Sequence, residues 1–287
     1  MTQYRRSASL QISEQSGQAA IVIRDLRISF EVNKNLDKDP NSATIKIYNM
    51  SQTTRSILEG TTQKVVLNAG YVDGDGEETV FVGNVTDIYT SIEKPLVVTT
   101  IEAQDGQKEL STSRISISRT SGTSGFAILK EILKSINLPN TFVSSSHVDN
   151  KYANAFSFSG RSIDAMSKVT DFLGLTWSVQ NGQIEILNYD SNNGNAIISL
   201  SELTGLIGVP EKTKNSDRVA KGQSTKVKSG WSVKSLLQPK LLPGGRISIS
   251  SSQIPKDSIF NIISVSHQGD TEMISSWNSS IGVVQNG

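Results

Sequence analysis

Along the first hundred positions, apolar and polar residues alternate with a period of two. Successive side chains of a strand point to opposite faces of a sheet, so this period is typical of strands with one buried face. The pattern predicts about five or six antiparallel strands before residue 105, and a sheet of that size usually curls into a barrel or a sandwich. The alternating runs are residues 21–32, 42–50, 64–71, 78–89 and 96–104.

One short helix is predicted inside this strand-rich region, at residues 51–58. Ser51 stands where a helix N-cap belongs, because its hydroxyl can accept a hydrogen bond from a backbone N–H of the first turn. Ile57 and Leu58 are expected to form the buried side, and Gly60 suits the left-handed position after a helix. The Asp and Gly residues at 73–78 predict a hairpin turn, since the spacing and terminal Glu of an EF-hand calcium loop are absent.

The middle of the chain changes to a helical period. Apolar side chains recur at helical spacing over residues 126–136 and 163–172, which predicts two amphipathic helices. Two alternating runs then flank Asn181 and Gly182, a pair that favours a tight hairpin turn. Residues 105–200 are therefore predicted to form a small α+β domain.

The last third returns to short alternating runs. We predict a C-terminal β domain at residues 201–287 that packs with an N-terminal β domain at residues 1–104. The lysine-rich stretch at residues 211–240 is expected to be a solvated or subunit-bridging linker. The predicted fold class is mainly β, with antiparallel β-barrel domains and an α+β middle.

The composition removes most catalytic and metal chemistry. The chain has no cysteine and two histidines, which excludes disulfides, thiolate metal sites and cysteine nucleophiles. His267 and Asp270 are predicted to lie in a turn, with Gly269 at positive φ, because no Gly-x-Ser-x-Gly nucleophile motif accompanies them. His147 is predicted to be a loop residue. We therefore predict no catalytic residue, no cofactor and no bound metal.

The net charge and the hydropathy of the chain do not point to nucleic acid or a membrane as a partner. The formal net charge is +1, so any contact with nucleic acid must be local. No run approaches eighteen apolar residues and no secretory h-region follows the N-terminus, so we expect no membrane span and folding in the cytosol.

Candidate interface residues lie in the basic stretch near residue 231. Trp is enriched at interface hot spots, and Trp231 lies in a polar segment, whereas Trp177 is expected to pack in a core. The basic stretch has no interleaved aromatic residue before Trp231, which argues against stacking on bases. The predicted interface candidates are Trp231, Lys226, Lys228 and Arg218.

In their order along the chain, four stretches resemble the baseplate hub proteins of contractile-tailed bacteriophages, the family of tail hub and late control protein D. The first joins "SATIKIYNMSQTTRSIL" to "NAGY" and "FVGNVTDI", and the second is "QDG" at 104–106. The third is "SGRSIDAMSKVTDFLGLTWSVQNGQIEIL", and the fourth is "SLLQPKLLPGGRISISS" followed by "SVSHQGDTEMISSW". The resemblance covers nearly the whole chain, departing at Met50, where Leu is more usual, and at the double glycine 244–245.

The resemblance implies a structural, non-enzymatic hub subunit with tube-like barrel domains. It implies a homotrimeric ring in the virion tail baseplate that joins the tail tube, or a tube-initiator protein, to the central spike and contacts other baseplate proteins. DNA would pass through the ring without sequence-specific binding, and the helix at 51–58 would cover the edge or outside of a barrel. Two alternatives stay open: a peptidoglycan- or polysaccharide-binding or hydrolytic tail module, and the hub of a related contractile injection system.

Overall fold

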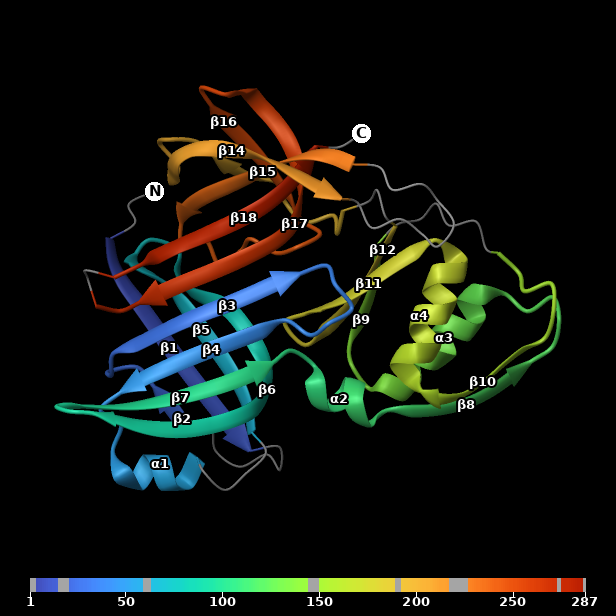
Figure 1. Cartoon of the computed structure of the whole chain (residues 1–287), viewed down its shortest axis with the longest axis horizontal. Coiled ribbons are helices and arrows are strands. Elements are labelled where there is room, and N and C mark those ends of the chain that lie inside the picture. Colours follow the sequence, from blue (N-terminus) through green and yellow to red (C-terminus); the bar gives the residue numbers. More distant parts are fainter. Residues whose placement is uncertain are drawn as a thin grey trace.

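The computed structural model describes residues 4–14, 21–58, 63–143, 150–188, 192–216, 227–272 and 275–285, and it is mostly β. Most strands join one large sheet, and a smaller α+β part lies to its side (Figure 1). The helices are α1 (Gln52–Leu58), α2 (Gln107–Thr112), α3 (Gly125–Ile136) and α4 (Ser162–Leu173). The strands are β1 (Tyr4–Glu14), β2 (Ile21–Ile23), β3 (Ile28–Asn35), β4 (Ser42–Tyr48), β5 (Gln63–Asp73), β6 (Gly76–Glu93), β7 (Leu96–Gln104), β8 (Arg114–Arg119), β9 (Asn140–Val143), β10 (Phe156–Arg161), β11 (Leu175–Gln180), β12 (Gln183–Asn188), β13 (Ile198–Leu200), β14 (Leu206–Ser216), β15 (Val227–Leu236), β16 (Arg246–Ser251), β17 (Ile254–Asp270) and β18 (Trp277–Gln285).

The main path of the large sheet runs in the order β14-β15-β18-β17-β3-β4-β7-β6-β5-β1-β2, and β16 branches from it at β17 and pairs with β13. Strands from the two ends of the sequence meet inside it, where β3 pairs antiparallel with β17 from Asn35 opposite Ser264 to Ser29 opposite Asp270. The prediction of a mainly β fold with antiparallel sheets is confirmed.

The sheet encloses a first core between β3, β4 and β7 on one side and β1 and β5 on the other (Figure 1). The predicted alternation holds in β4, where Ile45 and Ile47 are fully buried and the residues between them are exposed. α1 lies at one end of this core, and the Ser51 hydroxyl accepts a hydrogen bond from the Thr54 N–H at 3.1 Å. Leu58 is buried in the core, which it closes from this end.

Ile57 is a correction to the predicted helix face, because 53% of its surface is exposed. Neighbouring helix residues point about 100° apart, and so short a helix covers the core with one narrow side, which Leu58 occupies. Gly60 lies outside the described residues.

The middle core forms where α3 and α4 pack together with the three-stranded sheet β11-β12-β9 and the pair β8-β10. α3 begins at a cap, where the Ser124 hydroxyl accepts from the Ala127 N–H, and α4 ends at Gly174, which takes the left-handed conformation. Asn181 and Gly182, both at positive φ, form the turn between β11 and β12. The predicted hairpin is therefore confirmed, and Trp177 is buried in this core as expected.

A third core lies between β13–β18, at the C-terminal end of the large sheet. The lysine-rich stretch is not a linker where it is described, because residues 211–216 pair with residues 227–232 as parts of β14 and β15. The chain has three tryptophans, and each packs in a different core: Trp277 in the first, Trp177 in the middle and Trp231 in the third.

Candidate assembly surfaces and the junctions between the cores

Of the four predicted interface residues, Trp231 and Lys228 lie in the described part of the chain. Trp231 lies on β15, 9% exposed, and the Lys212 ammonium sits 5.4 Å from the centroid of its ring. The backbone of Lys228 pairs with Asn215 on β14. Arg218 and Lys226 lie outside the described residues. The role of the four residues in assembly stays a prediction.

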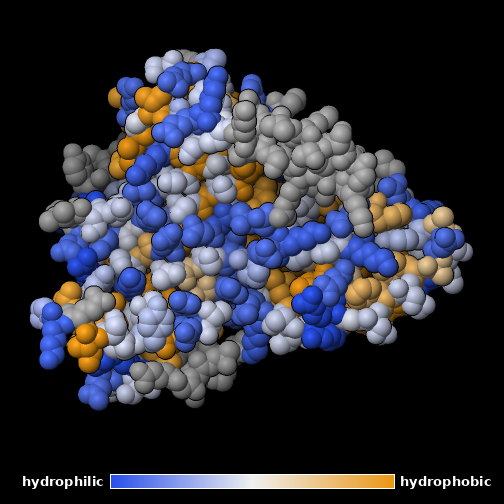
Figure 2. All heavy atoms as spheres, in the orientation of Figure 1, coloured by the Kyte–Doolittle hydropathy of each residue, from blue (hydrophilic) through white to orange (hydrophobic). Residues whose placement is uncertain are grey.

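An exposed apolar edge that sequence reasoning missed lies at β14. Within the described chain β14 has a paired neighbour, β15, on one side, and a bulge breaks the register between Ile207 and Glu211. Leu203, Ile207 and Val209 are 95%, 38% and 52% exposed, and we call these three residues the β14 edge patch. Figure 2 shows apolar surface in this upper region of the molecule, around β14 and β16. The alternation of Ile207 and Val209 across Gly208 was the available sequence signal.

The opposite end of the strand path is β2. This strand pairs with β1 on one side, with Val22 opposite Gln11. β2 is three residues long, and its central residue, Val22, is 50% exposed. β2 is therefore a short edge strand, and β14 is an edge strand with a bulge.

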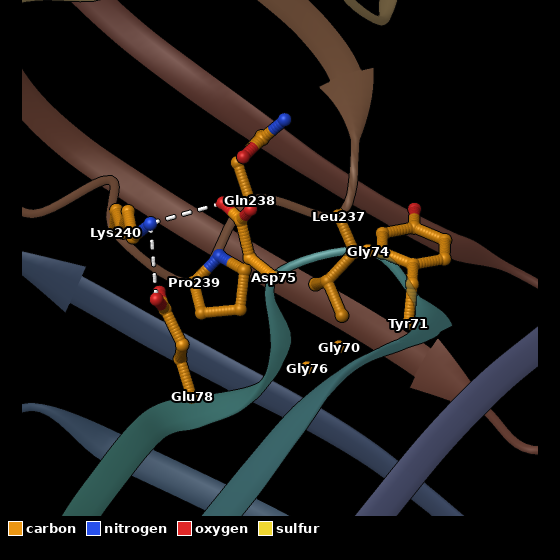
Figure 3. A pocket seen from close by; sticks show the side chains of 10 residues that line it. All are labelled: Gly70, Tyr71, Gly74, Asp75, Gly76, Glu78, Leu237, Gln238, Pro239 and Lys240. Carbon is orange, nitrogen blue, oxygen red and sulfur yellow. Dashed lines mark hydrogen bonds and ion pairs between the residues drawn. The ribbon is translucent and has the colours of Figure 1, made fainter. Parts of the chain in front are cut away.

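A clasp joins the first core to the segment that follows β15 (Figure 3). Lys240 Nζ lies 3.0 Å from Asp75 Oδ2 and 3.0 Å from Glu78 Oε1, and these hydrogen bonds raise the pKa of Lys240. Tyr71 lies beside Leu237, and burial raises its pKa to about 12. The pocket between these groups holds about 30 Å³, far below the several hundred Å³ of a ligand site. The pocket is therefore too small for a ligand, and its residues hold the chain's own segment after β15 against the first core.

A second clasp involves the predicted turn residue Asp270. The Arg27 guanidinium donates to both of its carboxylate oxygens, at 3.1 Å and 2.8 Å, and Asp270 also accepts from the Glu272 N–H. Burial raises the pKa of Asp270, but these hydrogen bonds outweigh it and the pKa is lowered overall. Asp270 does bond to its own turn, as predicted.

His267 and Gly269 are corrections, because both lie in strand β17 rather than in a turn. Gly269 is not at positive φ; a Cβ there would lie 2.3 Å from Phe30 Cζ, so the glycine makes room for a ring. His267 is fully buried, with Nδ1 2.8 Å from Ser279 Oγ. Burial and the nearby charge of Lys34 lower the pKa of His267 to about 3. Since Ser279 is fully buried too, no substrate atom reaches this Ser–His pair.

A polar junction links the middle core to the large sheet. Lys34 from β3 is 2% exposed and donates to Asn181 Oδ1 at 2.7 Å, in the β11–β12 turn. Asp105, fully buried after β7, accepts from the Gly182 N–H at 2.6 Å. The available sequence signal was the alternation of strand faces. Lys34 is two residues after Val32, so the two share one face of β3, and Val32 is part of the first core.

Among the described residues, no three His, Asp or Glu side chains converge on a point where a metal ion could be held. Within the same part of the chain, no helix has both the length and the apolar character needed to cross a membrane.

The fold is that of phage tail proteins. The 43 kDa tail protein of prophage MuSo2 from Shewanella oneidensis has a TM-score of 0.65 and 9% identity, over 98% of this chain and 97% of that one. A tail protein from Neisseria meningitidis MC58 gives 0.65 and 10%, over 99% and 98%. The E. coli c3393 protein, described as a type VI secretion component similar to T4 tail proteins gp27 and gp5, gives 0.63 and 12%, over 96% and 77%.

The family follows from the sequence itself. The family model described as baseplate hub gp41 matches residues 7–252. The chain therefore belongs to the baseplate hub gp41 family, and it is a structural protein of the phage tail baseplate. No curated protein matches the sequence significantly. The predicted resemblance to baseplate hubs is confirmed.

Proposed function

We propose that three copies of this chain form a ring that joins the tail tube to the central spike. The ring surrounds an axial channel through which DNA passes without sequence-specific contacts, and it assembles in the host cytoplasm before joining the tube or its initiator, the spike and other baseplate proteins. The chain works by assembly alone and is not an enzyme. It divides into the three domains expected from the sequence, at residues 1–104, 105–200 and 201–287.

The observation that carries this proposal is the strand path of the large sheet. The path passes through two β cores and ends at two strands, β14 and β2, whose outer edges have no partner in the described residues. A surface that differs at its two ends makes head-to-tail contacts between copies, and such contacts close into a ring when the rotation between copies allows it. Three copies then place six β cores around one axis.

The exposed residues at both ends support edge contacts. Unpaired backbone N–H and C=O groups favour pairing with another chain, and covering them in a ring removes this liability. The β14 edge patch and Val22 give each end exposed apolar surface that gains from burial. Trp231 and Lys228 lie on β15, which pairs with β14, so they remain interface candidates together with Arg218 and Lys226, which lie outside the described residues.

The test is the native mass by light scattering, with negative-stain images of the same peak. We expect a mass of three subunits and threefold rings with a central hole. Val209→Lys places a charge on the β14 edge patch and should release monomers. Ile259→Lys is the matched control, since Ile259 is a similarly exposed apolar residue (41%) at the C-terminal end of the large sheet but lies on the internal strand β17.

Each outcome has a distinct meaning. A wild-type monomer that stays a monomer after co-expression with its spike would overturn the ring. A ring that tolerates Val209→Lys as well as Ile259→Lys would keep the trimer but overturn the role of the β14 edge. Loss of turbidity of purified peptidoglycan on adding the protein would instead favour the hydrolytic alternative. The E. coli c3393 protein comes from a secretion system, so the fold alone does not separate a phage hub from an injection-system hub.

A further inference from the structure

A charged lysine with no access to solvent lies where the middle core meets the large sheet. Lysine is almost never fully buried unless it is paired, because taking an ammonium ion out of water costs several kcal/mol. Lys34 is nevertheless 2% exposed, and its ammonium donates at 2.7 Å to Asn181 Oδ1 in the β11–β12 turn. An apolar residue would suit this face of β3, whose other inward residues belong to the first core.

Charged and titratable groups converge on Lys34 from three directions. Asp105 comes from the end of β7, Glu185 from β12 and His267 from β17, and the charge of Lys34 acts on all three. These groups therefore belong to different parts of the fold: Asp105 follows the first core, Glu185 lies in the middle part, and His267 lies on the strand that continues into the third core.

The same turn is held by directional hydrogen bonds. Asp105 accepts from the Gly182 N–H at 2.6 Å. The Asn41 amide donates to the Val179 carbonyl at 2.6 Å and to Gln180 Oε1 at 3.0 Å. Gln180 in turn donates to the Asn35 carbonyl at 2.8 Å. One hairpin tip of the middle core is thus fixed to the ends of β3 and β7 and to the loop before β4.

The electrostatics indicate that this arrangement costs stability. Burial lowers the pKa of Lys34 to about 8 from its ordinary 10.5, although the carboxylates oppose this. The folded state therefore binds fewer protons than the unfolded state between these values, and stability rises as pH rises from about 8 to 10.5. Burial raises the pKa of Asp105 to about 6 from 3.8, so stability falls as pH rises through that range. Both shifts have the same cause, because burial disfavours the charged form of each group.

We propose that Lys34, Asp105 and Glu185 form an ionic latch that holds the middle core in a single orientation on the large sheet, at the expense of stability. Apolar contacts are not directional, and they tolerate small rotations of one core on another. A buried ion must keep its partners, so any rotation that separates Lys34 from Asn181, or moves it away from the carboxylates of Asp105 and Glu185, leaves a buried charge with less compensation. Buried polar groups of this kind fix register in other proteins even where apolar replacements are more stable.

The test measures an intramolecular distance across the junction. The chain has no cysteine, so Thr44→Cys on β4 and Lys130→Cys on α3, both at exposed positions, give two unique sites for spin labels. Pulsed electron resonance on labelled protein diluted with unlabelled protein reports the distance between them within one chain. We expect one narrow distance distribution for the parent protein.

Three variants separate the latch from ordinary packing. Lys34→Met should lose the single narrow peak. Lys38→Met is the matched control: it breaks an exposed ion pair to Asp171, 3.1 Å long, that crosses the same junction, and it should keep the peak. The third variant combines Lys34→Met, Asp105→Asn and Glu185→Gln, which leaves no uncompensated charge and retains an oxygen acceptor at 105.

The combined variant keeps the proposal testable if Lys34→Met does not fold. It should unfold at a urea concentration no lower than the parent, lack the parent's rise in stability between pH 8 and 10, and still show a broadened distance distribution. A single narrow peak at the parent distance in the folded combined variant would overturn the latch. A broadened peak in Lys38→Met equal to that in Lys34→Met would overturn it too, because any junction contact would then suffice.

Discussion

Replacing Gly269 by alanine tests whether the glycine in "HQGD" serves packing rather than a turn. A Cβ at this position of β17 would lie 2.3 Å from Phe30 Cζ, 2.4 Å from Phe30 Cε1 and 2.9 Å from Trp277 Cε3. Phe30 is 5% exposed and packs edge-on against Trp277, with ring centroids 5.6 Å apart. To reach an ordinary contact of 3.4 Å, the Phe30 ring must retreat by about 1 Å into a closed core.

Overpacking of this size costs about 1–3 kcal/mol. Gly282→Ala on β18 is the matched control, because its Cβ would meet Ser264 Oγ at 2.5 Å, and a hydroxyl can turn to another rotamer. Both changes remove the same backbone freedom from the unfolded chain, so the difference between them isolates the clash.

The assay is urea unfolding followed by the fluorescence of Trp277. In a background with Trp177→Phe and Trp231→Phe, Trp277 is the one remaining tryptophan and reports on the first core. Gly269→Ala should lower the free energy of unfolding by about 1–3 kcal/mol more than Gly282→Ala. Adding Phe30→Leu should recover part of that loss, because residues in contact are coupled. Equal losses in the two alanine variants, or no coupling to Phe30, would refute the packing role.

Three further predictions concern the surface clasps and the short helix. The pKa of Asp270 is lowered because Arg27 stabilises its charge, so the parent protein has extra stability above the ordinary carboxylate pKa and loses it as pH falls through the lowered pKa of Asp270. Asp270→Asn should remove this pH-dependent stability. Parallel pH profiles of the urea midpoint for the variant and the parent would contradict this. Leu58→Ala should cost about 2–5 kcal/mol while Ile57→Ala changes stability by less than about 0.5, and similar melting temperatures would refute the assigned helix face. Lys240→Met should cost less than about 1 kcal/mol in urea unfolding, because the clasp is solvated; a larger loss would mean that it carries the junction.

Local sequence rules predicted the elements that local physics determines. The alternation in β4, the capping hydroxyls of Ser51 and Ser124, and the turn at Asn181 and Gly182 each depend on a few neighbouring residues, and the structure confirms them. The family was also accessible from sequence, because the order of short motifs along the chain is itself informative.

The errors lie where tertiary contacts override a local signal. Gly269 is flanked by turn-favouring residues, but the approach of Phe30 from another strand explains the glycine. Ile57 and Leu58 look equivalent in sequence, and only the direction of α1 against the core distinguishes them. Lys34 lies on the inward face of β3, where the sequence pattern predicts an apolar residue. Its charge is explained by a tertiary contact, because the ammonium donates to Asn181, which is far away in the sequence.

The pairing of β3 with β17 joins the two β cores through one backbone ladder, whereas no such ladder joins the middle core to the large sheet in the described residues. The first and third cores share this antiparallel seam, which runs from Asn35 to Ser29, so they move as one body unless the ladder itself breaks. The strands β8 to β12 of the middle part form separate sheets, and the polar contacts of that part with the large sheet include those at the β11–β12 turn and the exposed ion pair of Lys38 with Asp171 on α4. In the proposed ring, the large sheet would therefore stay closed if the middle core turned, and the proposed latch at Lys34 would hold that core in one orientation.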